Sequence, residues 1–220
     1  MPEKNEVLDS IDINTLGWST FYKYRLQIRK SYKNIYKLKL KRKLFTIIAD
    51  QLKGNERVLD VGASNRNLGG KVKKEFNLVT YKTMDIDKNN EHDYYSLNEI
   101  NEPFDLILIT EVIEHIEFVE GLKLLRQLKF LLKQGGKIII TTPNIHHPHR
   151  YWDPDHKVPY RYDALGGALL YAGFRIEGMY RIYSEPILKY MSRVLLLPLF
   201  KFLDLDFARS IAVVARNEQE

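Results

Sequence analysis

The chain has 220 residues, of which 45% are apolar and 28% charged, and it contains no cysteine. These values are typical of one folded domain, and the lack of cysteine excludes disulfide scaffolds, thiolate nucleophiles and cysteine-ligated metals. No apolar stretch reaches the roughly 18 to 20 residues that a bilayer span requires. The polar N-terminus also lacks the features of a secretion signal. We therefore expect a cytoplasmic protein.

The positive charge is concentrated near the N-terminus. The formal net charge is +6, but ten basic residues and no acidic one lie between Ile13 and Ala49, so the remainder sums to −4. The chain outside that basic segment is therefore mildly acidic, and we divide it into a basic N-terminal extension, residues 1–52, and a domain, residues 53–220.

In chain order, the pattern predicts a helical extension and then alternating strands and helices. Aromatic and aliphatic residues interleave with lysine and arginine from Trp18 to Leu52, which favours helix. Strands are expected at Arg57–Val61, Leu78–Met84, Phe104–Thr110, Gly136–Thr142, Phe174–Tyr180 and Ser210–Arg216, and helices at Gly70–Glu75, Val119–Lys133 and Asp163–Ala172. Such alternation is typical of a parallel sheet flanked by helices. An apolar insertion, residues 185–207, precedes the last strand.

The stretch Val58–Asn65, with the sequence VLDVGASN, reads as a buried strand that ends in an acidic residue and a glycine before a turn and a helix. Gly62 would let the backbone approach a ligand at the carboxyl edge of the sheet. A dinucleotide site would need further glycines, and here Ser64 and Asn67 replace them. A strand–turn–helix with an incidental glycine is the alternative.

Acidic residues and a histidine follow the next two strands. Asp85 ends the second strand 23 residues after Gly62, where a carboxylate can accept both hydroxyls of a ribose. The third strand runs into Glu-Val-Ile-Glu-His at residues 111–115. The fourth ends in Thr-Pro-Asn at residues 142–144.

Together these motifs resemble the class I S-adenosylmethionine-dependent methyltransferases. The likeness is to a branch with (D/E)VG, E-V-x-E-H and T-P-N motifs, similar to methyltransferases of quinone biosynthesis and surface-glycan clusters. It spans Lys53 to Arg181 and resumes at Ser210–Arg216. It implies a Rossmann-like fold, in which a seven-stranded, mostly parallel sheet has an antiparallel last strand and helices on both faces. It also implies S-adenosylmethionine as the cofactor.

The resemblance also implies roles for single residues. Asp60 and Gly62 would line the methionine half of the cofactor, and Asp85 would hold the ribose. Asp93 would face the adenine amino group, with Leu97 beside the ring, and Thr110 and Glu111 would close the pocket near the sulfonium. The predicted cofactor site comprises Asp60, Gly62, Ala63, Ser64, Asp85, Ile86, Asp93, Tyr94, Thr110 and Glu111.

The first turn departs from the family's G-x-G-x-G pattern, since the chain reads Gly-Ala-Ser-Asn-Arg at residues 62–66. A chain that keeps the fold without catalysis, as a partner protein, is therefore an alternative.

Two histidines are candidate general bases for methyl transfer. His115 belongs to the E-V-x-E-H motif, and His156 lies in a loop that resembles the family's D-P-x-H segment; imidazole can take up a proton near neutral pH. His115 could instead make a structural hydrogen bond at a helix start. His146, His147 and His149 match no compact zinc pattern, so no metal site is predicted.

The two appendages bear on the acceptor. The basic extension could be a helix packed on the domain over the cofactor pocket, an RNA-binding arm, or a membrane-surface contact through residues 18–49. The apolar insertion could roof a lipid-like acceptor site, contact a membrane through residues 186–207, form a homodimer interface or be core. We favour methyl transfer to an oxygen of a small-molecule or lipid-linked acceptor, with RNA methylation as the alternative.

Overall fold

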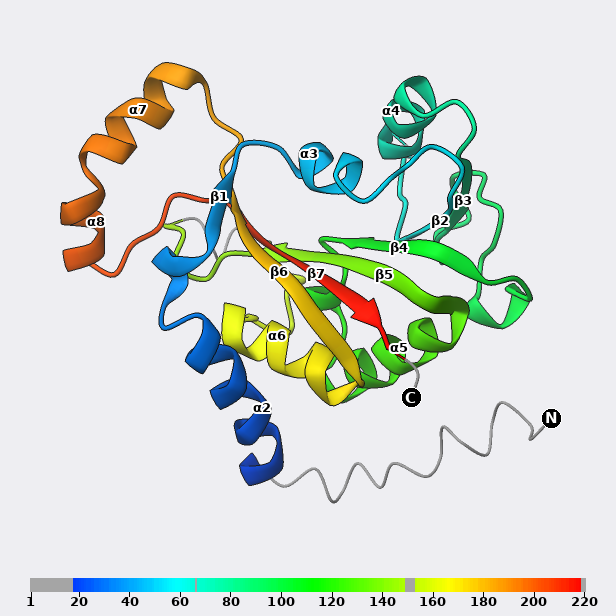
Figure 1. The fold of residues 1–220 in the computed structure, drawn as a ribbon, viewed down its shortest axis with the longest axis horizontal. Coiled ribbons are helices and arrows are strands. Elements are labelled where there is room, and N and C mark those ends of the chain that lie inside the picture. The colour runs from blue at the N-terminus through cyan, green and yellow to red at the C-terminus, as the bar shows by residue number, and fades with distance from the viewer. Residues whose placement is uncertain (1–17, 66, 149–152, 219–220) are drawn as a thin grey trace.

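The computed structural model describes residues 18–65, 67–148 and 153–218. Its centre is one seven-stranded sheet with the strand order β1-β6-β7-β5-β4-β2-β3 (Figure 1). The strands are β1 (Lys39–Lys41), β2 (Arg57–Val61), β3 (Thr80–Met84), β4 (Phe104–Thr110), β5 (Leu132–Pro143), β6 (Phe174–Ile182) and β7 (Ser210–Asn217). Only β7 runs antiparallel to its neighbours, β5 and β6. The predicted fold class is confirmed.

Helices cover both faces of the sheet because its central strands are apolar on both sides. In β4, the four residues Leu106–Ile109 are all buried, as expected for a strand inside a parallel sheet. One face packs against α2 (Trp18–Ser31), α5 (Phe118–Leu131) and α6 (Tyr162–Tyr171), and the other against α3 (Leu44–Ala49) and α4 (Asn67–Glu75) (Figure 1). Four leucines at three-residue spacing, Leu122, Leu125, Leu128 and Leu131, form the buried stripe of α5.

The extension is built into the domain, and one part of its predicted structure is wrong. A continuous helical pattern was expected from Trp18 to Leu52, but β1 interrupts it and pairs in parallel with β6 at the sheet edge. The sequence Lys-Leu-Lys at 39–41 alternates polar and apolar residues, which suits an edge strand better than a helix. The seventh strand of the sheet therefore comes from the extension.

Helix α2 packs closely on α6 because α6 has two glycines at the contact. A Cβ atom on Gly166 would lie 2.9 Å from Ile28, and one on Gly167 would lie 3.0 Å from Arg25. Arg25 also pairs with the fully buried Asp163 at 3.2 Å. Packing on the domain is therefore the interpretation of the basic helix that fits these contacts.

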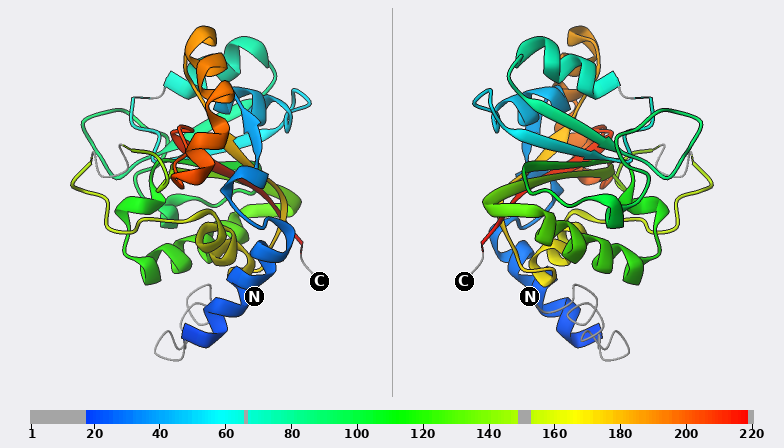
Figure 2. Two further views of the ribbon diagram at one scale, coloured as in Figure 1. Left: turned by 90° about the vertical axis from the view of Figure 1, so that its left-hand side faces the viewer. Right: turned by 90° about the vertical axis from the view of Figure 1, so that its right-hand side faces the viewer.

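The apolar insertion forms two short helices, α7 (Ile187–Leu195) and α8 (Leu197–Phe202). They project from one end of the sheet, and the left view in Figure 2 looks onto them. Leu188 and Leu195 are each 80% exposed and Phe202 is 85% exposed, so the insertion is not core. Among the helices of the described residues, none has the length and hydropathy needed to span a membrane.

Candidate methyl-transfer site

The first turn is held against the E-V-x-E-H motif by Gly62. This residue has a φ of +74°, and a Cβ atom at its position would lie 2.3 Å from Cγ2 of Val112. The amide N–H of Gly62 donates to the carbonyl oxygen of Met84 at 2.8 Å. Glycine is therefore required for backbone conformation and for packing against Val112, in addition to the ligand approach inferred from the sequence.

Asp85 is fixed beside this turn by backbone donors. Its Oδ2 accepts from the amide of Ser64 at 2.8 Å and its Oδ1 from the amide of Asp87 at 3.0 Å. Ser64 adopts a left-handed conformation, with φ of +44°, at the place of the family's second glycine. The next residue, Ile86, is 80% exposed. The edge thus presents an oriented carboxylate next to a free apolar side chain.

Asp60 lies beneath the turn and not on its surface. Its side chain is buried, and Oδ2 accepts from the Tyr81 hydroxyl at 2.7 Å. Burial raises its pKa to about 6, and Oδ1 has no hydrogen-bond partner among the described residues. Asp60 can therefore reach a ligand only through its free Oδ1, while its other oxygen braces β2 against β3.

The segment Asp93–Tyr94 pairs with the end of β3. The Asp93 carboxylate accepts from the amide and hydroxyl of Thr83, at 2.9 and 3.0 Å, and from Lys82 at 3.0 Å. Burial opposes ionisation of Asp93, but these hydrogen bonds outweigh it and lower its pKa. Tyr94 and Leu97 pack against the core. The contact of Asp93 with an adenine amino group stays a prediction.

The end of β4 carries Thr110 and Glu111 to the same sheet edge. Glu111 has a left-handed backbone, with φ of +55°, and its amide donates to the carbonyl and hydroxyl oxygens of Thr141. Like Ser64, it is a non-glycine residue in an unfavourable conformation, a condition that tends to occur at functional sites.

The two candidate bases are brought together by the backbone of Glu114, the residue before His115 in the E-V-x-E-H motif. The carbonyl oxygen of Glu114 accepts from the amides of Lys157 and Val158, at 2.8 and 3.0 Å. This places the His156 ring 4.8 Å from that of His115, between centroids. The structure therefore joins two histidines that are 41 positions apart in the sequence.

Sequence analysis missed Glu114. Its side chain is 1% exposed, and both carboxylate oxygens lack a hydrogen-bond partner among the described residues, as does the buried hydroxyl of Tyr160. Burial, followed by the charge of Glu111, raises the pKa of Glu114 to about 8. The available signal was a carboxylate that stands next to His115 between apolar residues, just after a buried strand.

Glu114, His115 and His156 each offer a ligand atom within 4.8 Å of the others. One carboxylate and two imidazoles form a donor set that divalent transition metals accept. His146 contacts the carbonyl oxygen of Asp204 and His147 packs on Phe207, whereas His149 lies outside the described residues. The prediction that the chain uses no metal stays a prediction.

Two neighbouring cavities open at this cluster and share Glu114, Pro143, Asp153 and His156. One, of about 380 Å³, continues to Thr142 and Tyr160. The other, of about 520 Å³, reaches from Glu111 and His115 to Lys189 and Arg193 of α7 and to Arg209 before β7. A small molecule would thus contact the E-V-x-E-H turn at one end and the insertion at the other.

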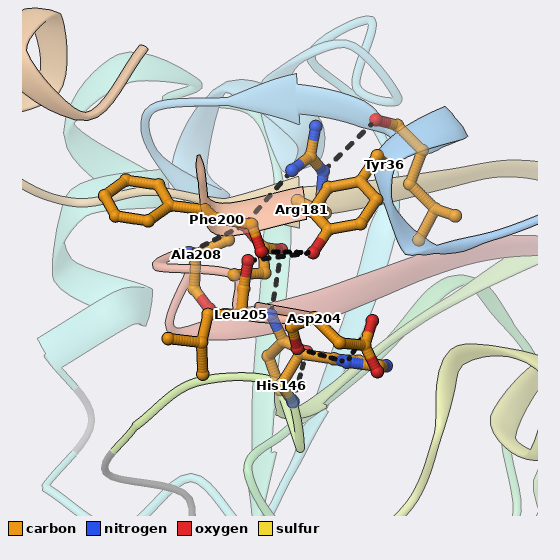
Figure 3. Close-up of polar contacts among 10 residues, drawn as sticks. Tyr36, His146, Arg181, Phe200, Asp204, Leu205 and Ala208 are labelled. Carbon is orange, nitrogen blue, oxygen red and sulfur yellow. Dashed lines mark hydrogen bonds and ion pairs between the residues drawn. The ribbon is translucent and has the colours of Figure 1, made fainter. Parts of the chain in front are cut away.

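A buried ion pair fixes the insertion to the sheet (Figure 3). Asp206 accepts from Arg181 at 3.1 Å and from the side-chain amide of Asn144, in the T-P-N motif, at 2.9 Å. Arg181 also donates to the carbonyl oxygen of Leu38, and the Tyr36 hydroxyl donates to the carbonyl oxygen of Leu205 at 2.9 Å. The extension, β6 and the T-P-N loop therefore together hold the segment that carries Phe207 and Arg209, which line the larger cavity.

Comparisons with known proteins identify the fold and its chemistry. A family model described as a methyltransferase domain matches residues 32–178. A structure of an S-adenosylmethionine-dependent methyltransferase from Archaeoglobus fulgidus is 20% identical, with a TM-score of 0.63, and covers 93% of this chain and 100% of its own. A putative methyltransferase from Bacillus halodurans is 16% identical, with a TM-score of 0.57, over 80% of this chain and 99% of its own.

Phosphoethanolamine N-methyltransferase 2 of Haemonchus contortus, in complex with S-adenosylmethionine, is also 16% identical, with a TM-score of 0.57. The match covers 80% of this chain and 52% of that one. No curated protein sequence matches the chain.

The residues of this chain fit that cofactor. Asp85 has its two oxygens oriented by backbone amides, as hydrogen bonding to two ribose hydroxyls requires. The exposed Ile86 can cover an apolar ring face, and the buried Asp60 has an unused acceptor oxygen. The chain belongs to the methyltransferase-domain family and is an S-adenosylmethionine-dependent methyltransferase.

Proposed function

We propose that the enzyme methylates an oxygen of a small-molecule or lipid-linked acceptor bound in the larger cavity. The observation that carries this proposal is the shape of that cavity, which joins Glu111, His115 and His156 to the insertion. Asp60, Gly62, Ala63, Ser64, Asp85, Ile86, Asp93, Tyr94, Thr110 and Glu111 are proposed as the cofactor side.

The reaction needs alignment and removal of one proton. Bound S-adenosylmethionine supplies an electrophilic methyl group. The chain has to orient the acceptor oxygen and remove its proton, and His115 or His156 would take it. Glu114, whose pKa is raised to about 8 by burial and by Glu111, is protonated at neutral pH and can donate a hydrogen bond to the acceptor.

The lipid-linked form of the acceptor is supported by the exposed face of α7 and α8. Leu188, Met191, Leu195, Leu199 and Phe202 follow each other at helical spacing, and all are exposed. Basic residues lie near this face: Lys201 is part of α8, and Arg42 of the extension donates to the carbonyl oxygen of Glu185, just before α7. An apolar face with basic neighbours is suited to the surface of an anionic bilayer.

Methyl transfer to fractionated cell extracts tests the proposal. The full chain is incubated with S-adenosylmethionine labelled in its methyl group and with lipid, small-metabolite or RNA fractions of its source organism. Label should enter the lipid or small-metabolite fraction, and mass spectrometry of the product should place the methyl group on oxygen. Either His115→Gln or His156→Gln should lower the rate by about 100-fold. Asp155→Asn, an exposed neighbour, should not.

RNA as acceptor is the alternative, favoured by the exposed basic side chains of the extension, which include Lys30, Lys33 and Lys43. Deleting residues 1–49 is not a clean test, because β1 is part of the sheet. Changing Lys30 and Lys33 to glutamine leaves the packed side of the extension intact. Label in the RNA fraction that these changes abolish would contradict the small-molecule or lipid-linked proposal.

Vesicle binding and oligomeric state distinguish two possible contacts of the exposed apolar face of α7 and α8, a membrane surface and a second copy of the chain. Co-sedimentation with vesicles containing phosphatidylglycerol should be lost in Leu188→Ser/Leu195→Ser. A homodimer through the same face would instead appear in sedimentation velocity without lipid, and the same double variant would convert it to monomer.

A further inference from the structure

Three cationic side chains line the end of the larger cavity that adjoins the insertion. Lys189 and Arg193 come from α7, and Arg209 directly precedes β7. Lys189 and Arg193 are four residues apart, so they lie on the same side of α7, one turn from each other. The exposed leucines Leu188 and Leu195 occupy other positions of this helix.

Among the described residues, Glu185 is the carboxylate that pairs with these cations at this end of the cavity. Glu185 accepts from Lys189 at 2.9 Å and pairs with Arg209 at 3.4 Å. The hydrogen bond from Lys189, together with the charges of Arg209 and Arg193, lowers the pKa of Glu185. This carboxylate is therefore ionised at neutral pH, and it still leaves an excess of positive charge at the cavity wall.

Arg193 is the cation whose hydrogen-bonding capacity is least used. Its guanidinium carbon lies 3.8 Å from the centroid of the Phe207 ring, which holds the group in place. Its Nη1 atom is buried and has no hydrogen-bond partner among the described residues. A buried charged donor without an acceptor is unfavourable, and a bound anion would remove that cost.

We infer that Lys189, Arg193 and Arg209 form a subsite for an anionic oxygen group, phosphate or carboxylate, of the methyl acceptor. This inference rests on the proposed function, because it takes the larger cavity as the acceptor site. The opposite end of the cavity holds the carboxylate of Glu111, which would repel an anion, and Glu114, which is protonated at neutral pH and contributes no positive charge. The charge distribution thus orients the acceptor, with its anionic end at α7 and its methylated atom toward His115 and His156.

Calorimetric titration of the full chain with three matched probes tests the subsite. Hexyl phosphate, hexanoate and hexanol share one alkyl chain and differ in the head group, and ionic strength is kept constant with sodium chloride. At least one anionic probe should bind about tenfold or more tightly than hexanol. Hexyl phosphate against hexanoate distinguishes the two head groups. Inorganic phosphate tests whether the anion binds without an attached chain.

Variants of opposite sign identify the residues. Arg193→Gln and Lys189→Gln should each weaken binding of the anionic probe by about tenfold or more, because each removes a charged donor. Glu185→Gln should tighten it, because that change removes the competing carboxylate. Lys123→Gln, which alters the net charge equally but lies on α5, should have no effect. Lys189 is exposed, so its variant decides the matter if Arg193→Gln fails to fold.

Equal affinity for all three probes would overturn the subsite. So would an anionic probe that binds more tightly than hexanol, if its affinity is the same in the parent and in Glu185→Gln, Lys189→Gln and Arg193→Gln. Binding of S-adenosylhomocysteine, measured in parallel, should be the same in every variant; a parallel loss would assign the cations to the cofactor instead. Failure of the proposed function looks different, since methyl transfer to the lipid and small-metabolite fractions would then be absent while anion binding persists.

Discussion

Two regions at one sheet are held together differently. One is the first turn, next to the end of β3, and the other is the larger cavity, next to the insertion. The turn is stabilised by backbone hydrogen bonds between neighbouring strands, such as those from Gly62 to Met84 and from Ser64 to Asp85. The cavity depends on side chains from distant segments: Glu114 lines it, and the Arg181–Asp206 pair holds the segment that carries Phe207 and Arg209 into its wall. Changes at the turn should therefore mainly reduce cofactor binding, whereas changes around the cavity should also alter the stability of the protein.

The largest effect is expected from Asp206→Ala. It leaves Arg181, only 9% exposed at its side chain, without its carboxylate, and breaking a buried ion pair costs about 3–5 kcal/mol. Urea unfolding of both proteins measures the difference. Asp204→Asn, in the same loop but with a side chain 78% exposed, should stay within about 0.5 kcal/mol of the parent. A loss below about 1 kcal/mol for Asp206→Ala would show that the insertion does not depend on this pair.

A dependence of stability on pH is expected next, from Glu114. Its pKa is raised to about 8 by burial and by Glu111, above the value in an unfolded chain, so the folded state binds the proton more tightly. The stabilisation is complete below about pH 4 and is lost as pH rises through 8, and on the order of 3 kcal/mol of it is lost between pH 5.5 and 8.5. The free energy of unfolding should fall between pH 5.5 and 8.5.

Glu114→Gln is the matched variant for that measurement, because it stays neutral and keeps the shape of the side chain. Its unfolding free energy should fall much less over the same range, with the remainder contributed by Asp60, whose burial raises its pKa to about 6. Parallel pH profiles for parent and variant would contradict a protonated Glu114 at neutral pH.

Gly62→Ala tests the first turn, the other region of the comparison, because this change should destabilise the fold as well as affect the turn. The added methyl group meets Val112 at 2.3 Å, and alanine disfavours a φ of +74°, at a combined cost of about 2 kcal/mol. Val112→Ala would remove the clash, so the same glycine change should cost less in that background. Equal costs in both backgrounds would show that the motifs are not coupled by packing.

The smallest change in free energy is expected for Asp85→Ala, and it should appear in cofactor binding and not in the stability of the fold. Loss of the carboxylate should weaken S-adenosylhomocysteine binding by at least tenfold, about 1.4 kcal/mol, in calorimetric titration. The exposed Asp87→Ala should bind like the parent. Unchanged affinity in Asp85→Ala would place the ribose elsewhere.

Much of the fold could be predicted from the sequence, for a physical reason. Buried parallel strands such as Phe104–Thr110 are short apolar runs, and helices such as α5 repeat leucine every three residues, so both are local patterns. The same holds for the turn residues Gly62 and Asp85, whose positions follow from the ends of strands. Strand β1 was missed because three residues cannot reveal that their partner is β6, more than 130 positions away.

The sequence by itself determined the order of strands β2 to β7 and of helices α4, α5 and α6, the antiparallel last strand through a family resemblance, and the polar residues that reach the carboxyl edge of the sheet. Only the tertiary structure decided that His115 and His156 meet, that Glu114 is buried without a partner, and that Asn144 supports Asp206. These properties depend on which distant segments exclude water around a side chain. Local patterns carry no information about that burial, and it is burial that fixes the charge state of Glu114.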